Sequence, residues 1–461
     1  MSDLDITKIL NYLQNKDLKI FFSGIGGISM HAIAAVLHQK GYKTGGSDIV
    51  ESDSVKKLRA MGIEVSIPHK SENVREYDLL VYNARIKDDN PEITEAKKLN
   101  IPIIKRAQML GALMSGYKTS VGISGTHGKS TVTSMTSEIF MQAGTDPSLF
   151  IGTVYPPINS AYKYGKNDYC IVESCEYFNS FWDFPPNIAV ILNIEMDHPD
   201  FFKNLDDVIN SFKKYLENTL DTAIINGDDE NTLKAAENFK GEVITYSLKN
   251  EKANIFVTNI NYPDGFPEFD IIANGKNYAH VKLLVPGEFN IYNAAAAASV
   301  AYTCGIDGKS VEAGLNIFKG AGRRFEYKGT LNGTKVYDDY AHHPTAVKKA
   351  VAVMKKIAQR NNGNLWYVFQ PHTYSRTHEL LDDLCEALSY ADNLILTDIY
   401  SATEKNTYDI YSKDIAARLN NCVFIEKFED IAEYLKSHAV ENDLIVITGA
   451  GDINNLTKLL V

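Results

Sequence analysis

A glycine-containing turn between a buried strand and a helix constrains the fold of this chain more than any other stretch. Ser120-Val121-Gly122-Ile123 has the composition of a short buried strand, and from Ser130 apolar residues recur at helical spacing until Gly144. The turn itself reads Gly125-Thr126-His127-Gly128-Lys129-Ser130-Thr131. A strand that passes through a tight turn directly into a helix predicts a βα unit, and therefore an α/β fold.

The residues of this turn are of the types that bind phosphate. Gly125 and Gly128 let a ligand approach the backbone, and the N–H groups at the helix start favour an anion. Lys129 adds a positive charge and Ser130 an oxygen ligand for Mg²⁺. The general P-loop pattern would require glycine at Ile123, so the spacing differs from it. We predict a site for a nucleoside triphosphate, in competition with a plain structural turn.

Length and composition limit the classes of protein to consider. The 461 residues suggest about three domains, and 44% hydrophobic with 23% charged residues is ordinary for a globular protein. A net charge of −11 gives no basic footprint for nucleic acid. The start of the chain does not have the pattern of a leader, and no apolar run reaches the length of a membrane span, so we expect a cytoplasmic protein. Five scattered cysteines indicate neither a disulfide framework nor a zinc site.

A second glycine turn lies near the start of the chain. A strand at 19–23 runs into Gly24-Ile25-Gly26-Gly27, and a helix follows until Gly41. The next strand, at 42–44, leads to Gly46-Ser47-Asp48, and a Rossmann fold holds a ribose with an acidic residue at this place. A further strand at 79–83, a helix at 90–100 and a strand at 101–104 continue the alternation. We predict a nucleotide-binding, Rossmann-like domain over residues 1–112, with a purely structural turn as the alternative.

Two further strands of the middle segment end in acidic residues. The strand at 169–172 is followed by Glu173, and the strand at 187–193 leads to Asp197 and His198. Ligands bind at the carboxyl edge of open α/β sheets, so these side chains are expected to surround a metal ion at the phosphates. His198 suits a second cation or an indirect role, because Mg²⁺ prefers oxygen ligands.

The rest of the middle segment has a different sequence pattern. Residues 242–285 are short, alternating and rich in turns, which predicts antiparallel hairpins. Asn290 is a suitable N-cap for the alanine-rich helix that follows it. We predict a central P-loop-type ATPase sheet with a small antiparallel extension, over residues 113–321.

The last segment again gathers polar residues behind strands. Asp338-Asp339-Tyr340-Ala341-His342-His343-Pro344 lies between a strand and a helix, and the strand at 365–369 is followed by Gln370, His372 and Arg376. Strands at 394–397, 423–425 and 444–448 alternate with helices to the end of the chain. We predict a C-terminal Rossmann-like domain over residues 322–461, with binding or catalysis at this edge. The turn Gly449-Ala450-Gly451 is interpreted as structural.

These motifs occur together, in this order, in one known family. Gly125-Thr-His-Gly-Lys-Ser130, Asn193-x-Glu195-x-Asp197-His198, Gly287-x-Phe-Asn290-x-x-Asn293, Gly322-Arg-Arg-Phe325, Asp338-Asp-Tyr-Ala-His-His-Pro344 and Phe369-Gln-Pro-His-Thr-Tyr-Ser-Arg376 resemble the motifs of the Mur ligases across all three domains. The resemblance implies an ATP- and Mg²⁺-dependent ligase of peptidoglycan precursor synthesis whose domains close around the substrates. The first glycine turn and the histidine pair resemble the branch that joins L-alanine to UDP-N-acetylmuramate.

The resemblance also implies roles for individual residues. Those for the uridine diphosphate group are Gly24, Gly26, Gly27, Ser47 and Asp48. Those for ATP are Gly125, Thr126, His127, Gly128, Lys129, Ser130, Thr131, Asn290, Asn293, Arg324 and Asp338. Those for metal are Ser130, Glu173 and His198. His343, His372 and Arg376 would line the place where the muramoyl carboxylate meets alanine, and Lys129, Arg324 and His343 would be catalytic.

Two positions depart from the family pattern. Phe289 stands where relatives usually have histidine, and Ser130 where they commonly have threonine. The first change affects the expected adenine contact, whereas the second keeps the hydroxyl group.

Three other functions remain open at this point. A ligase that attaches a recycled tripeptide to the same sugar nucleotide would share most of the motifs. A dinucleotide oxidoreductase would account for the Gly24 turn and Asp48 but not for Lys129, and a nucleotide-switch module would need no carboxylate substrate. The sequence does not determine the oligomeric state, the preference for alanine over serine or glycine, or the general base, for which His343 is a candidate by residue type only.

Overall fold

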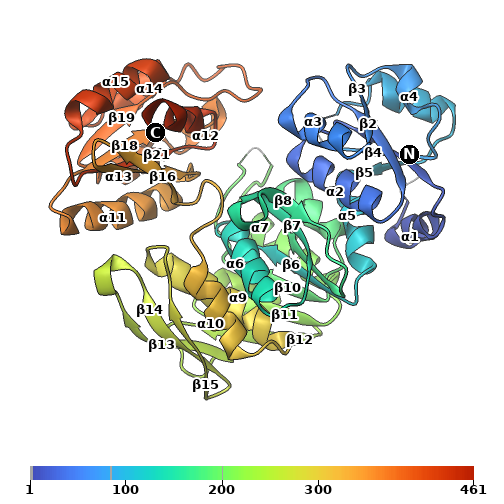
Figure 1. Ribbon diagram of the computed structural model, residues 1–461, viewed down its shortest axis with the longest axis horizontal. Helices are drawn as coiled ribbons and strands as arrows, with labels where there is room; N and C mark the ends of the chain where they lie inside the picture. Colours follow the sequence, from blue (N-terminus) through green and yellow to red (C-terminus); the bar gives the residue numbers. More distant parts are fainter. Residues whose placement is uncertain (1–3, 84–85, 200) are drawn as a thin grey trace. The chain divides into compact units, whose positions relative to one another are not determined.

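The computed structural model describes residues 4–83, 86–199 and 201–461, and these contain three separate β-sheets (Figure 1). The chain divides into two compact units. The first holds residues up to Thr258 with Asp270–Ala279 and Tyr292–Leu315, and the second holds Asn259–Phe269, His280–Ile291 and Asn316–Val461. Helices alternate with most strands of each sheet, as the predicted three-domain α/β fold requires, except in the runs of strands at residues 148–173 and 242–282 of the central sheet and 326–339 of the C-terminal sheet. The predicted domain limits at 112 and 321 remain predictions.

The N-terminal sheet has the strand order β3-β2-β1-β4-β5, and its neighbouring strands are all parallel. Its strands are β1 (Lys19–Ser23), β2 (Lys43–Ser47), β3 (Glu64–Ser66), β4 (Leu79–Tyr82) and β5 (Ile103–Lys105). The predicted strand at 42–44 is longer than expected, because it continues through Gly45 and Gly46. A Cβ atom at Gly46 would collide with the carbonyl oxygen of Phe22, so glycine permits the close pairing of β1 and β2.

Helices with conventional caps connect these strands. They are α1 (Ile6–Gln14), α2 (Ile28–Gln39), α3 (Asp53–Ala60), the 3₁₀ turn η1 (Ser71–Val74), α4 (Pro91–Lys98) and α5 (Arg106–Ser115). Asp5, Ser52 and Asn90 cap α1, α3 and α4 through their side-chain oxygens. The helix α2 contributes to the hydrophobic core of this sheet, and its residues from Met30 to Leu37 are all buried.

The central sheet has ten strands in the order β15-β14-β13-β12-β11-β10-β6-β9-β7-β8. They are β6 (Thr119–Ser124), β7 (Ser148–Tyr155), β8 (Ser160–Lys163), β9 (Tyr169–Glu173), β10 (Ile188–Ile191), β11 (Thr222–Asn226), β12 (Glu242–Ser247), β13 (Ile255–Asn261), β14 (Glu268–Ala273) and β15 (Lys276–Lys282). The expectation that residues 242–285 form only antiparallel hairpins is wrong at its start: β12 pairs parallel to β11, and β13 parallel to β12. The short alternating pattern identified the strands but not their direction.

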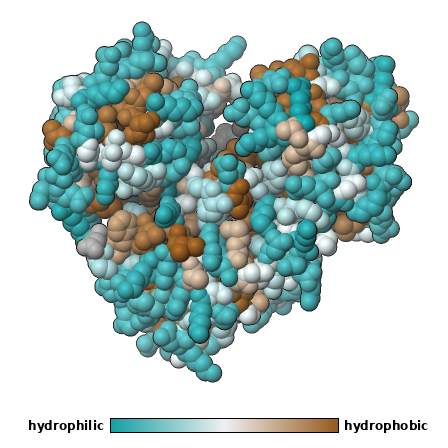
Figure 2. Space-filling view, in the orientation of Figure 1, coloured by the Kyte–Doolittle hydropathy of each residue, from teal (hydrophilic) through white to brown (hydrophobic). Residues whose placement is uncertain are grey.

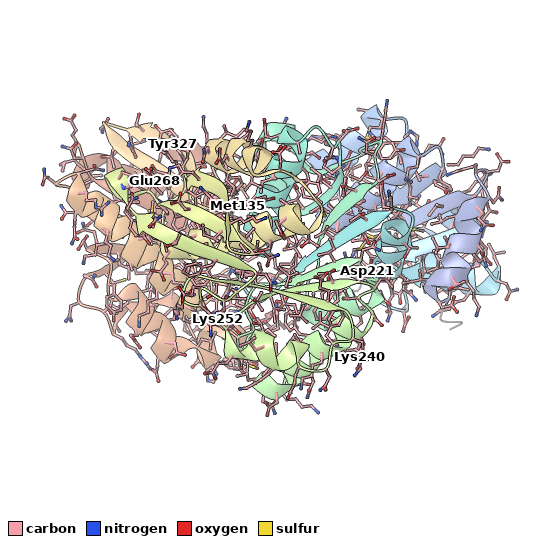
Figure 3. All side chains as sticks on the ribbon, turned by 90° about the horizontal axis from the view of Figure 1, so that it is seen from below. Met135, Asp221, Lys240, Lys252, Glu268 and Tyr327 are labelled. Carbon is pink, nitrogen blue, oxygen red and sulfur yellow. The ribbon has the colours of Figure 1, made fainter. Side chains whose placement is uncertain are left out.

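The helices of the central segment are α6 (Lys129–Gln142), α7 (Leu205–Glu217), α8 (Glu230–Ala236), α9 (Glu288–Thr303) and α10 (Gly308–Ile317), with 3₁₀ turns η2 (Pro156–Ile158), η3 (Tyr177–Asp183) and η4 (Pro263–Gly265). Met135 of α6 is fully buried, whereas Lys240 and Lys252 are exposed, and all three are labelled in Figure 3. The expected N-cap at Asn290 is wrong, because α9 already begins at Glu288. The Asn290 amide instead donates to the carbonyl oxygen of Pro286 at 2.8 Å.

The C-terminal sheet has the order β16-β17-β21-β18-β19-β20, with β16 antiparallel to β17 and the other pairs parallel. Its strands are β16 (Glu326–Leu331), β17 (Thr334–Asp339), β18 (Leu365–Phe369), β19 (Asn393–Leu396), β20 (Cys422–Phe424) and β21 (Leu444–Thr448). Its helices are α11 (Pro344–Arg360), α12 (Tyr374–Glu379), α13 (Leu381–Leu388), α14 (Ser412–Ala416), α15 (Phe428–His438) and α16 (Thr457–Leu460), with the 3₁₀ turn η5 (Ile453–Leu456). Because β17, β21 and β18 are parallel neighbours, the predicted polar segments after β17 and β18 lie at one edge.

Hydrophilic residues cover most of the face seen in Figure 2, with hydrophobic patches between them. Among the residues that the structure describes, no helix combines the length and the apolar character needed to cross a bilayer.

Candidate active site

The turn between β6 and α6 requires glycine at its helix end. Gly128 is the N-cap of α6 and has φ of 88°, a left-handed conformation that disfavours other residues. A Cβ atom at this position would lie 2.7 Å from Oδ1 of Asn293. Asn293 of α9 therefore lies directly against the turn, where the resemblance expects an ATP contact.

The segment that follows β10 supports the turn from one side. The N–H of Thr126 donates to the carbonyl oxygen of Asn193 at 3.0 Å, and the N–H of His127 donates to the Asn193 side chain at 2.8 Å. The His127 ring is 3.3 Å from a carboxylate oxygen of Glu195. These contacts fix the conformation of the turn before any ligand binds.

Lys129 is held by the turn itself and by an acidic residue. Its ammonium donates to the carbonyl oxygens of Gly125 at 2.5 Å and Thr126 at 3.1 Å, and to Oε1 of Glu176 at 3.0 Å. Burial alone would lower the pKa of Lys129, but the charge of Glu176 raises it above its ordinary value. Glu176 was not among the predicted site residues, although it stands three positions after Glu173 in the same motif.

Ser130 and Glu173 meet at the start of α6. The Ser130 hydroxyl donates to Oε2 of Glu173 at 2.7 Å, and the N–H of Gly152 donates to the same oxygen at 2.9 Å. A Cβ atom at Gly152 would collide with this carboxylate, which explains the glycine in β7. A hydroxyl and a carboxylate side by side match the oxygen ligands that Mg²⁺ prefers. The next residue, Thr131, is buried in the first turn of the helix.

His198 lies beside the same acidic residue as Lys129. Its Nε2 atom is 3.9 Å from Oε1 of Glu176 and 3.8 Å from Oδ2 of Asp197. Its ring stacks on Tyr177 with centroids 4.2 Å apart, and its φ is 53°. Glu176 thus links Lys129 to His198, while Ser130 and Glu173 form a separate pair at the start of the same helix.

The first glycine turn is closed by the end of β2. The N–H groups of Gly24 and Ile25 both donate to the carbonyl oxygen of Ser47 at 2.9 Å. The N–H of Gly26 donates to Oδ2 of Asp48 at 2.8 Å, and the N–H of Ile49 donates to Oδ1 at 2.7 Å. Asp48 therefore shapes the turn by accepting one backbone N–H group at each of its carboxylate oxygens.

Gly27 is the N-cap residue of α2, and its carbonyl oxygen accepts the N–H of His31 at 2.8 Å. The helix start therefore follows this turn directly, as the sequence predicts. His69 and Glu92 lie at the same edge and were not predicted, because they come from segments with no recognisable motif.

Two adjacent arginines of the C-terminal segment have different surroundings. Arg323 donates to Asp338 at 3.2 Å and to the carbonyl oxygens of Gly449 at 2.6 Å and Gly451 at 3.1 Å. Arg324 lies over the Tyr340 ring, 4.7 Å from its centroid. Arg323 therefore joins the strand ends of β17 and β21. Burial raises the pKa of Asp338 to about 6, although Arg323 acts in the opposite direction.

His372 lies among polar and aromatic side chains at the end of β18. Its ring is 5.8 Å from that of His342 and 5.7 Å from that of Tyr400, and its Nδ1 is 3.5 Å from a guanidinium nitrogen of Arg376. His343 is the N-cap residue of α11 and is 9% exposed. Hence His372 and Arg376 lie together as predicted, whereas the histidine whose ring is next to His372 is His342, which the prediction passed over.

Phe289, which departs from the family pattern, packs against another aromatic ring. Its ring lies parallel to that of Phe325, with centroids 5.9 Å apart, beside the hydrophobic core of the C-terminal sheet.

Three family profiles match consecutive parts of the chain. The profile described as the Mur ligase family, catalytic domain, matches residues 19–118. The Mur ligase middle domain matches residues 123–301, and the Mur ligase, glutamate ligase domain, matches residues 323–451.

Relatives extend the similarity over nearly the whole length. The chain is 42% identical over 450 residues to a UDP-N-acetylmuramate–L-alanine ligase of Caldicellulosiruptor bescii, covering 96% of this chain and 98% of that protein. The structure of the UDP-N-acetylmuramate–alanine ligase MurC of Thermotoga maritima superposes with a TM-score of 0.80 at 28% identity and covers 96% and 97% of the two chains. A murein peptide ligase of Psychrobacter arcticus superposes with a TM-score of 0.71 at 20% identity, over 96% and 98%, which shows the shared fold alone. The chain belongs to the Mur ligase family.

Proposed function

We propose that the protein joins L-alanine to the lactyl carboxylate of UDP-N-acetylmuramate at the expense of ATP, in peptidoglycan precursor synthesis in the cytoplasm. The observation that carries the proposal is the cluster of Lys129, Ser130 and Glu173 at the turn, in a chain 42% identical to a ligase of this name. The recycling ligase is not favoured, because the similar murein peptide ligase is only 20% identical. A dinucleotide oxidoreductase or a nucleotide switch has no carboxylate substrate that this cluster could activate.

The reaction requires a better electrophile than a carboxylate. In the first step a carboxylate oxygen attacks the γ-phosphorus of ATP, ADP leaves, and an acyl phosphate forms. In the second step the neutral amine of alanine attacks the acyl carbon, phosphate leaves, and the amine proton passes to a base. The products are the amide, ADP and phosphate, so the atoms and charges balance.

The chain supplies positive charge and hydrogen bonds for the first step. Lys129 would leave Glu176 and the turn carbonyls to bind the phosphates, and backbone N–H groups at the start of α6 would bind them as well. Ser130 and Glu173 would hold Mg²⁺, with His198 at a second cation; the metal would neutralise charge on the phosphates.

Residues of the other segments would bind the remaining groups. Asn290 and Asn293 are assigned to the adenine side and Arg324 to the phosphates. Asp338 is assigned to the ATP ribose, and its buried Oδ1 has no hydrogen-bond partner among the residues described. The turn Gly24–Gly27 with Ser47 and Asp48 is assigned to the uridine diphosphate. His372, Arg376 and His343 are assigned to the reacting carboxylate and amine, with His343 as candidate base.

Phosphate release tests the proposal directly. ATP, Mg²⁺ and UDP-N-acetylmuramate are incubated with the protein, with and without L-alanine. The released phosphate is measured, and the mass of the product is determined by mass spectrometry. We expect release only with both substrates, and formation of the alanyl sugar nucleotide. Release with the tripeptide but not with L-alanine would reassign the protein to the recycling branch.

A further inference from the structure

A fully buried carboxylate lies beneath the proposed sugar-nucleotide turn. Glu92, in the first turn of α4, is 0% exposed. Its N–H donates to the capping side chain of Asn90 at 2.8 Å, which fixes the backbone at this point. Burying an ionised carboxylate costs several kcal/mol unless hydrogen bonds compensate it. The hydrogen-bond partners of Glu92 therefore indicate the role of its charged carboxylate.

The four partners come from three separate segments of the chain. Oε2 accepts hydrogen bonds from the hydroxyls of Ser23 at 2.6 Å and Ser47 at 2.8 Å, and lies 3.0 Å from Nδ1 of His69. Oε1 accepts from the Asn73 amide at 2.9 Å. Burial alone would raise the pKa of Glu92, but these hydrogen bonds together lower it. The group is therefore ionised at neutral pH.

This network reaches the turn through two serines. Ser23 is the last residue of β1 and directly precedes Gly24. Ser47 is the last residue of β2, and its carbonyl oxygen accepts the N–H groups of Gly24 and Ile25. One carboxylate thus fixes both strand ends from which the turn is built.

The network also orients His69. An ionised carboxylate can only accept hydrogen bonds, so the Nδ1 atom of His69, 3.0 Å from Oε2 of Glu92 and 2.8 Å from the Ser47 hydroxyl oxygen, carries a hydrogen to bond to the carboxylate. Nε2 is then the ring nitrogen left for a ligand, and the side chain is 12% exposed. The hydrogen bond to Glu92 raises the pKa of His69, with help from the charges of Glu92 and Asp48 and against the effect of burial. The protonated ring would donate from Nε2 to an oxygen of the nucleotide.

We propose that Glu92 is a positioning residue of the sugar-nucleotide site, which holds Ser23, Ser47 and His69 so that the turn Gly24–Gly27 and Nε2 of His69 present donors to the uridine nucleotide. The inference rests on the proposed function. It goes beyond it by naming a residue that acts without touching the ligand.

The test compares Glu92→Gln with Glu95→Gln. Glu95 lies on the same helix, is 9% exposed, and bonds to Arg75 at 2.9 Å instead of to the strand ends. Binding of UDP-N-acetylmuramate is measured by calorimetry from about pH 5.5 to 8.5, a range that spans the titration of histidine. ADP binding and thermal unfolding of each variant serve as controls.

We expect Glu92→Gln to weaken sugar-nucleotide binding about tenfold, the loss typical of one buried hydrogen bond to a charge. In the wild type, binding weakens as pH rises through the pKa of His69, because the Nε2 hydrogen is lost. Without the carboxylate that pKa falls, so the midpoint of the pH profile moves to lower pH. Neither effect is expected in Glu95→Gln, and ADP binding stays unchanged in both variants.

Binding by Glu92→Gln within about twofold of the wild type, with the same midpoint, overturns the inference. If that variant does not fold, His69→Gln carries the test, and a persisting pH dependence then overturns the inference. Failure of the wild type itself to bind UDP-N-acetylmuramate would overturn the proposed function, and the inference with it.

Discussion

At the scale of single residues, Glu176 pairs with the ammonium of Lys129, the group that we propose binds the ATP phosphates. The Lys129 side chain is 14% exposed and the Glu176 side chain 2% exposed, at a separation of 2.9 Å. The Glu176 carboxylate thus compensates the positive charge of Lys129. Under the proposed function, a bound nucleotide would take the place of Glu176 as the negatively charged partner of Lys129.

Glu176→Gln should affect the stability of the nucleotide-free protein and of the nucleotide-bound protein differently. Removing the carboxylate leaves the buried ammonium with weaker partners, so we expect the free protein to lose about 1–3 kcal/mol of unfolding free energy. A bound nucleotide restores a negative partner, so the increase in melting temperature caused by saturating ADP should be larger than in the wild type. Thermal unfolding with and without ADP and Mg²⁺ measures both quantities.

Glu217→Gln is the matched control. Glu217 pairs with Lys214 at 3.0 Å, but both side chains are more than half exposed, and such pairs contribute little. We expect neither melting temperature to change. An unchanged or smaller ADP effect in Glu176→Gln would show that Glu176 does not compete with the nucleotide.

At the scale of elements, the sequence predicts best where a buried strand ends in a glycine turn. The pairs β1–α2 and β6–α6 lie where the alternation of apolar runs and glycines places them. The strand β18 matches its predicted limits, because all five of its residues are buried and hydrophobic. Local patterns suffice here, since one strand and the following helix form a single unit.

Elements shaped by distant contacts could not be predicted. Gly45 and Gly46 disfavour a strand locally, yet β2 includes them because β1 and Tyr77 leave no room for side chains. The antiparallel pair β7 and β8 was also missed. Gly152 interrupts the apolar pattern of β7, and the reason for this glycine is its contact with Glu173 on β9, which lies elsewhere in the sequence. The acids Glu92 and Glu176 were likewise missed, because their partners lie far away in the sequence.

The glycine at the start of α6 can be tested against the glycine after its end. Gly128 has φ of 88° and Gly144 has φ of 69°, so alanine strains the backbone at both positions. Only at Gly128 would the new Cβ atom meet another group, Oδ1 of Asn293 at 2.7 Å, because nothing lies within 4 Å at Gly144. We expect both variants to lose about 1 kcal/mol or more of stability, measured by denaturant unfolding.

Nucleotide binding should distinguish these two variants. Gly128→Ala also displaces the turn from α9, so its ADP affinity should fall about tenfold or more. Gly144→Ala should bind ADP like the wild type. Equal losses of ADP affinity in both would mean that backbone strain, and not the contact with Asn293, limits binding.

At the scale of the whole molecule, the proposed substrates belong to different sheets. The uridine nucleotide is assigned to the edge of the five-stranded sheet and the ATP phosphates to the edge of the ten-stranded sheet. Asp48, Ser47 and the turn Gly24–Gly27 form hydrogen bonds to one another and to other N-terminal residues, such as His31 and Glu92. A substitution at one binding site is therefore expected to leave the ligand affinity of the other site unchanged.

A pair of variants tests this division. Lys129→Ala removes the charge that would bind the transferred phosphate, so turnover should fall about 100-fold or more while UDP-N-acetylmuramate binding stays intact. Gly26→Ala places a Cβ atom 2.8 Å from Oδ2 of Asp48, which should weaken UDP-N-acetylmuramate binding about tenfold without changing ADP affinity. Calorimetry with each ligand and a phosphate-release assay measure all of these effects. Loss of both ligands in either folded variant would mean that the two sheets do not bind independently, and that the phosphate and sugar-nucleotide assignments must be revised together.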